Sequence, residues 1–388
     1  MKKTLVALLV AAAAASASAT TVYNNEGTTV DVGGRLDVMI GKFNENERTD
    51  LRNNESRIEF KAQHDLGNGL KAIAFTRFRF NDKDGDRWDT QQSFNNIKTN
   101  KLWLGFEAKD IGRVTFGKQD TNGDAIQIND NAYIFGGNNN VLDGGDKVLS
   151  FRSADFQIAE GHKLGFGTDY VFGQSTKDNK NVQLEDELKY GYNAVAFYEG
   201  NFSGLKANLN AGYTVAKYDD ATDSNVTGSQ EKSWRVASKL GYGPAEFGVE
   251  YGETKFENGH TDAGKGKFLE VAAKYNYLEN ASVYTAWEHN VYKGDTDGLA
   301  FDVRDANFLR SVAGKLSVEN GGKLTENVFI LGTDYAFTPN VVTYAEYAYS
   351  HVKANSKAKI EGAGVTGYAD GTAKAKDHRY GVGVRVYF

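Results

Sequence analysis

Apolar and polar residues alternate along most of the chain, and this period of two constrains the fold more than any other feature. The segments that show it most clearly are 30–38, 56–66, 101–108, 205–215, 269–277, 329–337 and 381–388. Successive side chains of a strand point to opposite faces, so the pattern predicts strands with one apolar and one polar face. The 388 residues include only 2 prolines, which favours long strands because proline cannot donate to a ladder. The sequence therefore predicts an all-β protein.

Two further features favour a transmembrane barrel over a soluble sandwich, whose strands also alternate. Aromatic residues gather near the ends of the alternating segments, as Tyr335 and Phe337 do, and such rings suit a membrane interface. The connections also alternate in length, from short turns such as 66–69 to long polar stretches such as 81–97. Short turns on one rim and long loops on the other are typical of bacterial outer-membrane barrels.

The number of connections predicts the size of the barrel. We expect eight long loops and seven short turns, hence 15 connections and 16 strands. About 10 residues are enough for a tilted strand to cross a bilayer, so residues 20–388 can form one such antiparallel barrel. A barrel of this size keeps a lumen open to water, and its closure leaves no strand edge unpaired in lipid.

The N-terminus reads as a secretory signal. Lys2 and Lys3 precede an apolar stretch over 5–15, and Ala17-Ser18-Ala19 fits a cleavage site. We expect residues 1–19 to be removed; a retained membrane anchor fits less well, because the stretch is short. Loss of the two lysines takes the formal net charge from −6 to −8, which argues against a nucleic-acid partner. The absence of cysteine excludes disulfides and cysteine-based metal sites.

Several motifs, taken in order along the chain, resemble the general diffusion porins of Gram-negative outer membranes. They are Val32-Gly33-Gly34-Arg35-Leu36-Asp37, Ser56-Arg57-Ile58-Glu59-Phe60-Lys61, Leu102-Trp103-Leu104-Gly105-Phe106, Gly112-Arg113-Val114-Thr115-Phe116-Gly117-Lys118-Gln119 and Arg385-Val386-Tyr387-Phe388. Within that family the chain is most similar to the major porins of the Pasteurellaceae. The resemblance implies a homotrimer of 16-stranded barrels, each with its own pore and an inward-folded third loop. It also implies that the terminal Phe388 is part of an assembly signal.

Strand phase places several basic side chains on the polar face, which is the lumen face of a barrel. By resemblance to the family, Arg35, Arg57, Lys101 and Arg152 occupy the basic wall of a pore constriction. Opposed charges in a narrow throat set up a field that sorts ions and orients polar solutes. The alternative is that these are hydrated lumen charges away from the throat. The predicted basic wall is Arg35, Arg57, Arg77, Lys101 and Arg152, with Lys61 and Arg79 in the same phase.

The third loop, 118–147, is expected to supply the acidic side of the constriction. Its candidate carboxylates are Asp120, Asp124 and Asp130; the alternative is a hydrated loop. The candidate tip is Tyr133, Ile134, Phe135, Gly136 and Gly137, where glycine can adopt positive φ. Compared with the family pattern, Ile134 replaces a second carboxylate and Tyr133 replaces a proline. We therefore expect a weaker preference for cations than in a two-carboxylate porin.

The remaining motifs predict no metal site, cofactor site or catalytic site. The acidic runs 82–86 and 120–124 lack the glycine and glutamate of a calcium loop, and the six histidines are scattered, so neither metal nor cofactor is expected. An outer-membrane enzyme would need a nucleophile and base, for which no local signature is present. The predicted function is passive passage of ions and small hydrophilic solutes, with a sugar-specific channel as an alternative. The expected surroundings are outer-membrane lipid and lipopolysaccharide.

Overall fold

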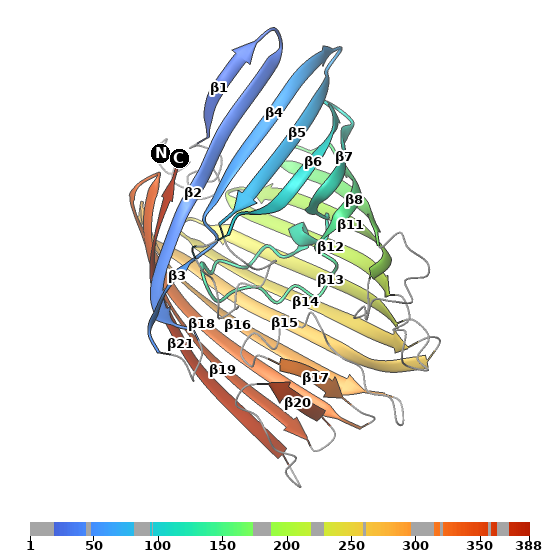
Figure 1. Ribbon diagram of the computed structural model, residues 1–388, viewed down its shortest axis with the longest axis vertical. Helices are drawn as coiled ribbons and strands as arrows, with labels where there is room; N and C mark the ends of the chain where they lie inside the picture. Colours follow the sequence, from blue (N-terminus) through green and yellow to red (C-terminus); the bar gives the residue numbers. More distant parts are fainter. Residues whose placement is uncertain are drawn as a thin grey trace.

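The computed structural model describes most of the chain after the signal segment (Figure 1). The described residues are 19–43, 48–80, 94, 96–173, 188–218, 229–258, 261–295, 314–318, 321–355, 358–362 and 372–388. The predicted signal peptide, apart from Ala19, and the acidic run 82–86 lie outside them. Among the described residues no helix is long and apolar enough to cross a membrane.

Strands make up nearly all of the regular structure. Their bounds are β1 Thr20–Asn25, β2 Thr28–Lys42, β3 Asp50–Asn53, β4 Arg57–Gly67, β5 Leu70–Arg79, β6 Lys98–Ala108, β7 Gly112–Asp120, β8 Gly144–Ser153, β9 Phe156–Ala159, β10 His162–Phe172, β11 Leu188–Phe202, β12 Leu205–Tyr218, β13 Ser229–Tyr242, β14 Ala245–Asn258, β15 Thr261–Leu278, β16 Ala281–Gly294, β17 Gly314–Val318, β18 Lys323–Thr338, β19 Val341–Asn355, β20 Ala358–Gly362 and β21 Thr372–Tyr387. A 3₁₀-helix, η1, covers Asp124–Ile126.

The sheet closes into an antiparallel barrel of sixteen strands, as the number of connections predicts. Nineteen strands share one sheet, but β3 and β9 prolong the barrel strands β4 and β8, because each pairs with the same neighbour. β1 is a further short piece, paired with the first half of β2. Closure comes from β2 and β21, which pair from Arg35↔Tyr387 to Lys42↔Tyr380. The barrel therefore has no open edge between its first and last strands.

The two ends of the described chain meet on one edge of β2. β1 pairs with the first part of that strand and β21 with the second. The Phe388 N–H donates to the Gly34 carbonyl at 3.1 Å, and the Gly34 N–H donates back to Phe388 at 2.8 Å. β1 and β21 therefore complete this edge of the barrel together.

Connections follow the predicted alternation with one exception. β6 and β7 are joined by a three-residue turn, 109–111, whereas β16 and β18 are separated by 295–322. On the same rim as that long connection, however, Asn258 of β14 pairs directly with Thr261 of β15, so the prediction of a long loop is wrong there. The two strands extend as one hairpin, and a hairpin needs only a short turn.

The two faces of the barrel differ as the pattern requires. On β6, the side chains of Leu102, Leu104 and Phe106 are 59%, 58% and 49% exposed. By contrast, Glu250 and Glu270 belong to the opposite face and are buried. An apolar outer band and a polar interior are the arrangement of a transmembrane barrel.

Candidate functional site

The segment 121–143, between β7 and β8, hydrogen-bonds to the polar faces of strands distant in sequence. The side-chain amide of Asn210 on β12 donates to the Ala125 carbonyl at 2.8 Å. Ile126 of η1 is fully buried in an apolar cluster with Val195 and Phe197. The beginning of this loop segment is therefore held by both polar and apolar contacts.

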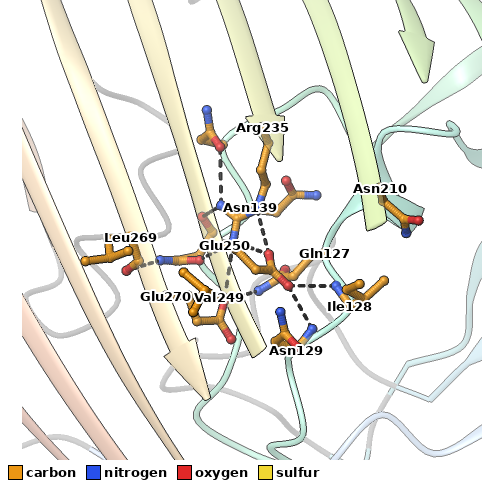
Figure 2. Close-up of polar contacts among 12 residues, drawn as sticks. Gln127, Ile128, Asn129, Asn139, Asn210, Arg235, Val249, Glu250, Leu269 and Glu270 are labelled. Atoms are coloured by element: carbon orange, nitrogen blue, oxygen red, sulfur yellow. Dashed lines mark hydrogen bonds and ion pairs between the residues drawn. The ribbon is translucent and has the colours of Figure 1, made fainter. Parts of the chain in front are cut away.

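Arg235 of β13 is at the centre of the next set of contacts (Figure 2). Its side chain is fully buried and donates from Nε to Glu250 Oε2 at 2.7 Å, and from Nη2 to Glu270 Oε2 at 3.3 Å. It also donates to the Asn138 carbonyl at 3.1 Å and to Asn138 Oδ1 at 2.7 Å. A buried charge is costly unless it is paired and hydrogen-bonded, so this guanidinium ties the loop segment to two wall carboxylates.

The same two carboxylates also hold the loop segment directly. The backbone N–H groups of Ile128 and Asn129 both donate to Glu250 Oε1 at 2.8 Å. The Gln127 amide donates to Glu270 Oε2 at 3.0 Å (Figure 2). Hydrogen bonds to charged acceptors are stronger than neutral ones, and these fix the backbone of 127–129 against β14 and β15.

The tip of the loop segment is held by Glu346 of β19. Its carboxylate accepts the backbone N–H of Tyr133, that of Ile134 at 2.9 Å and that of Phe135 at 3.0 Å. The Tyr284 hydroxyl donates to the same carboxylate at 2.6 Å. Successive backbone N–H groups that converge on one anion form a nest, so this carboxylate holds the backbone of the tip.

Aromatic and apolar contacts support the tip. The Tyr133 ring stacks on Tyr344, with 4.5 Å between ring centroids, and its hydroxyl donates to Asp334 at 3.2 Å. Burial raises the pKa of Tyr133 above its ordinary value, which keeps the phenol neutral. Ile134, only 2% exposed, packs in a cluster with Met39 and other apolar side chains.

The two tip glycines meet different requirements. Gly137 has φ +96°, a conformation that favours glycine, as the sequence predicts. Gly136 is not among the described residues with positive φ. It is instead needed for space, because a methyl group there would overlap the Asp130 carboxylate.

Four predicted arginines of the basic wall share two carboxylates. Arg57 and Arg77 contact Glu59 from Nε, at 2.7 and 2.6 Å. The other two, both bound to Glu55, are Arg35 at 3.0 Å and Arg79 at 3.1 Å. These side chains come from neighbouring strands β2, β4 and β5, so in these described contacts four guanidinium groups share two carboxylates.

Lys101 joins this group, and Arg152 does not. Lys101 is the cross-strand partner of Arg77 and forms an ion pair with Asp120. Arg152 on β8 instead lies over the Phe197 ring, 3.2 Å from its centroid, and 3.5 Å from Asn122 Oδ1.

The predicted loop carboxylates are dispersed. Asp120 faces Lys101 at the end of β7, whereas Asp124 is exposed at the start of η1. Asp130 accepts the Ala132 N–H at 3.1 Å.

Sequence reasoning missed the wall residues that hold the loop segment, of which Arg235, Glu250 and Glu346 matter most. In the sequence, these residues show only that they are polar and alternate with outward-facing apolar residues. Many lumen-facing positions share this pattern.

Comparison with known proteins agrees with this architecture. A family model described as Gram-negative porin matches residues 4–355. The chain is 34% identical over 403 residues to a major outer membrane protein of Pasteurella multocida, with 100% of both chains covered. The trimer form of the outer membrane protein OmpT of Vibrio cholerae is 19% identical, with TM-score 0.61, 93% of this chain and 100% of that chain covered. An anion-selective porin from Comamonas acidovorans is 16% identical, with TM-score 0.62 and the same coverage. The family match and the full-length relative place this chain in the Gram-negative porin family.

Proposed function

We propose that the loop segment 121–143 narrows the lumen of this outer-membrane diffusion channel opposite the basic wall. The proposal is based on the positions of the two strands, β14 and β19, to which the segment is bound. β14 and β19 each lie six strands from β7 around the barrel, in opposite directions. A segment that leaves β7 and hydrogen-bonds to the polar faces of both has to cross the interior.

The charges on either side suggest the selectivity. On the wall, Arg57 and Arg77 share Glu59, and a second arginine pair shares Glu55. On the loop segment, the position of a second carboxylate is taken by buried Ile134. A throat with a surplus of fixed positive charge attracts anions. We therefore expect passage of small hydrophilic solutes and ions with a low preference for cations.

Other parts of the proposal concern processing and assembly. Residues 1–19 are expected to be removed before the barrel folds, and Phe388 to be part of the signal for assembly in the outer membrane. The trimer form of the Vibrio cholerae relative supports a homotrimer here. The expected partners are surrounding outer-membrane lipid, lipopolysaccharide and the solutes themselves. Membership of the porin family favours a channel over an enzyme.

The experiment is single-channel recording in planar lipid bilayers with refolded residues 20–388. Stepwise ohmic currents in groups of three, unchanged by added sugars, are expected. Removal of residues 127–138, joined by a short glycine linker, should raise the conductance if this segment narrows the lumen. A shortened protein that folds, runs as the parent does in an unboiled gel and conducts equally would overturn the constriction. Block by one class of sugar would instead identify a specific channel.

A further inference from the structure

Lysines stand directly opposite one another on five consecutive strands of the barrel. Each is the cross-strand partner of the next, from β13 through β14, β15 and β16 to β18. We call this row the lysine ladder; its members are Lys232, Lys255, Lys265, Lys293 and Lys323. Like charges directly opposite each other destabilise a sheet, so the row needs a compensating partner.

The lysine ladder faces away from the lumen. On β14, Lys255 lies between Thr254 and Phe256, which are both buried on the interior side. On β16 and β18, the neighbours of Lys293 and Lys323 are Tyr292 and Leu324, which are fully buried. The ladder side chains therefore share the face that carries the outward apolar residues.

Register also gives the height of the ladder on the barrel. Four residues from it, on the side of the short turns, the same outward face carries Val236, Tyr251, Leu269 and His289. Four residues of strand are about 13 Å long. The opposite ends of these strands lead into the rim that contains the long connection 295–322. The ladder therefore lies beyond the apolar band, on the head-group side, and it slants toward the rim from Lys232 to Lys323 because barrel strands are tilted by about 35–45°.

Carboxylates of the described residues neutralise only part of the ladder. Lys232 and Lys255 share Glu257. Lys255 also contacts Asp262 at 2.6 Å, and the Lys265 ammonium lies 3.4 Å from the Asp295 carboxylate. Within the described part of the chain, Lys293 and Lys323 have no ion pair. These two are direct cross-strand partners, so two ammonium groups that form no ion pair with any described residue stand opposite each other on adjacent strands.

We propose that the lysine ladder binds the phosphate groups of an anionic lipid, and that Lys293 and Lys323 form the centre of the site. Ammonium groups bind phosphate as compact point charges, and basic clusters at a membrane surface attract anionic lipid head groups. Neighbouring strands are about 4.8 Å apart, so the five-strand row is roughly 19 Å long. It is long enough for a head group with more than one phosphate.

The inference rests on the proposed lipopolysaccharide partner and identifies where its phosphorylated part is bound. It is independent of the constriction, because the ladder and the loop segment use opposite faces of the wall. A failure here leaves the conductance predictions intact. A failure of the constriction likewise leaves this site intact.

The test compares binding of diphosphorylated lipid A and of its dephosphorylated form to the refolded barrel in detergent. The variant K293Q/K323Q should bind the diphosphorylated lipid at least about tenfold more weakly, since each lysine near a lipid surface contributes measurably. The conservative variant K293R/K323R should retain binding. A matched control, K109Q/K163Q, removes two exposed lysines near the short turns and should bind as the parent does.

Three results of the lipid-binding comparison would overturn the proposal. They are unchanged binding in K293Q/K323Q, an equal loss in K109Q/K163Q, and equal affinity for the dephosphorylated lipid. Competition by inorganic phosphate at the same concentration as lipid A would also overturn it, since the site would then recognise a free anion. Unboiled gel mobility and single-channel conductance are measured on every variant. Unchanged values show that any loss of binding does not come from misfolding.

Discussion

A fully buried ion pair joins Arg235 of β13 to Glu250 of β14, with 2.7 Å between Nε and Oε2. Both side chains also bind the loop segment, Arg235 through Asn138 and Glu250 through the N–H groups of Ile128 and Asn129. The pair therefore links the position of the loop to the structure of the wall. This coupling makes the loop sensitive to changes on strands that are far from it in the sequence.

Replacement of Arg235 by methionine should release the loop segment and destabilise the protein. The change leaves Glu250 and Glu270 buried without their cation, and loss of one partner of a buried pair typically costs about 3–5 kcal/mol. We expect a lower unfolding temperature in detergent and larger, noisier single-channel currents. The double variant R235M/E250Q removes one uncompensated charge and should recover part of the stability. An R235M protein with parental stability and conductance would contradict the role of the pair.

Replacement of Glu346 by glutamine should free the tip alone. The amide offers one neutral oxygen to the N–H groups of Tyr133, Ile134 and Phe135, in place of a charged carboxylate. Each hydrogen bond to a charged group contributes about 1.5–3 kcal/mol, so faster cleavage by protease within 130–137 and flickering currents are expected. Glu279→Gln, in an exposed turn, is the control. Equal protection of the tip in both variants would argue against the nest.

Ion selectivity should depend on the arginines of the basic wall that share carboxylates. Arg57→Gln leaves Glu59 with Arg77 as its one arginine partner among these contacts, which lowers the positive surplus near the throat. The reversal potential in a KCl gradient should shift toward greater cation preference. Lys109→Gln, which removes an exposed charge in a short turn, should leave it unchanged. The proposed wall would be wrong if both variants had the parental reversal potential.

A carboxylate introduced at the tip is expected to act differently from what the motif alone suggests. From sequence, Ile134→Glu should restore the second family carboxylate and raise cation preference. In the structure, Ile134 is buried against Met39 and Phe43, and an unpaired charge there is costly. We therefore expect I134E to loosen the loop, with reduced stability and a shift in conductance, whereas I134L stays close to the parent. A stable I134E protein with increased cation preference and unchanged conductance would favour the interpretation from the motif, in which the new carboxylate faces the pore.

The sequence was sufficient for the barrel but not for the contacts that hold the loop. The period of two is local, so it identifies strands and faces, and the tip motif 131–137 identifies a distinctive loop. The wall partners are different, because the bonds from Asn129 to Glu250 and from Phe135 to Glu346 join residues 121 and 211 positions apart. No local pattern distinguishes these glutamates from other lumen-facing acids. The register of a closed barrel decides which of them meet the loop.

Closure of the barrel should depend on the small size of Gly34. This residue exchanges two backbone hydrogen bonds with Phe388, and a methyl group on it would come within 2.4 Å of the Arg57 carbonyl oxygen and within 2.6 Å of the phenylalanine ring. Overpacking of this kind costs typically 1–3 kcal/mol, and here it acts where the first and last strands join. Gly34→Ala should therefore lower the yield of folded barrel, measured as the fraction that migrates differently before and after boiling. Gly241→Ala is the matched control, since its nearest neighbour would be 3.8 Å away. Equal folded yields for the two variants would show that the close packing around Gly34 does not limit closure.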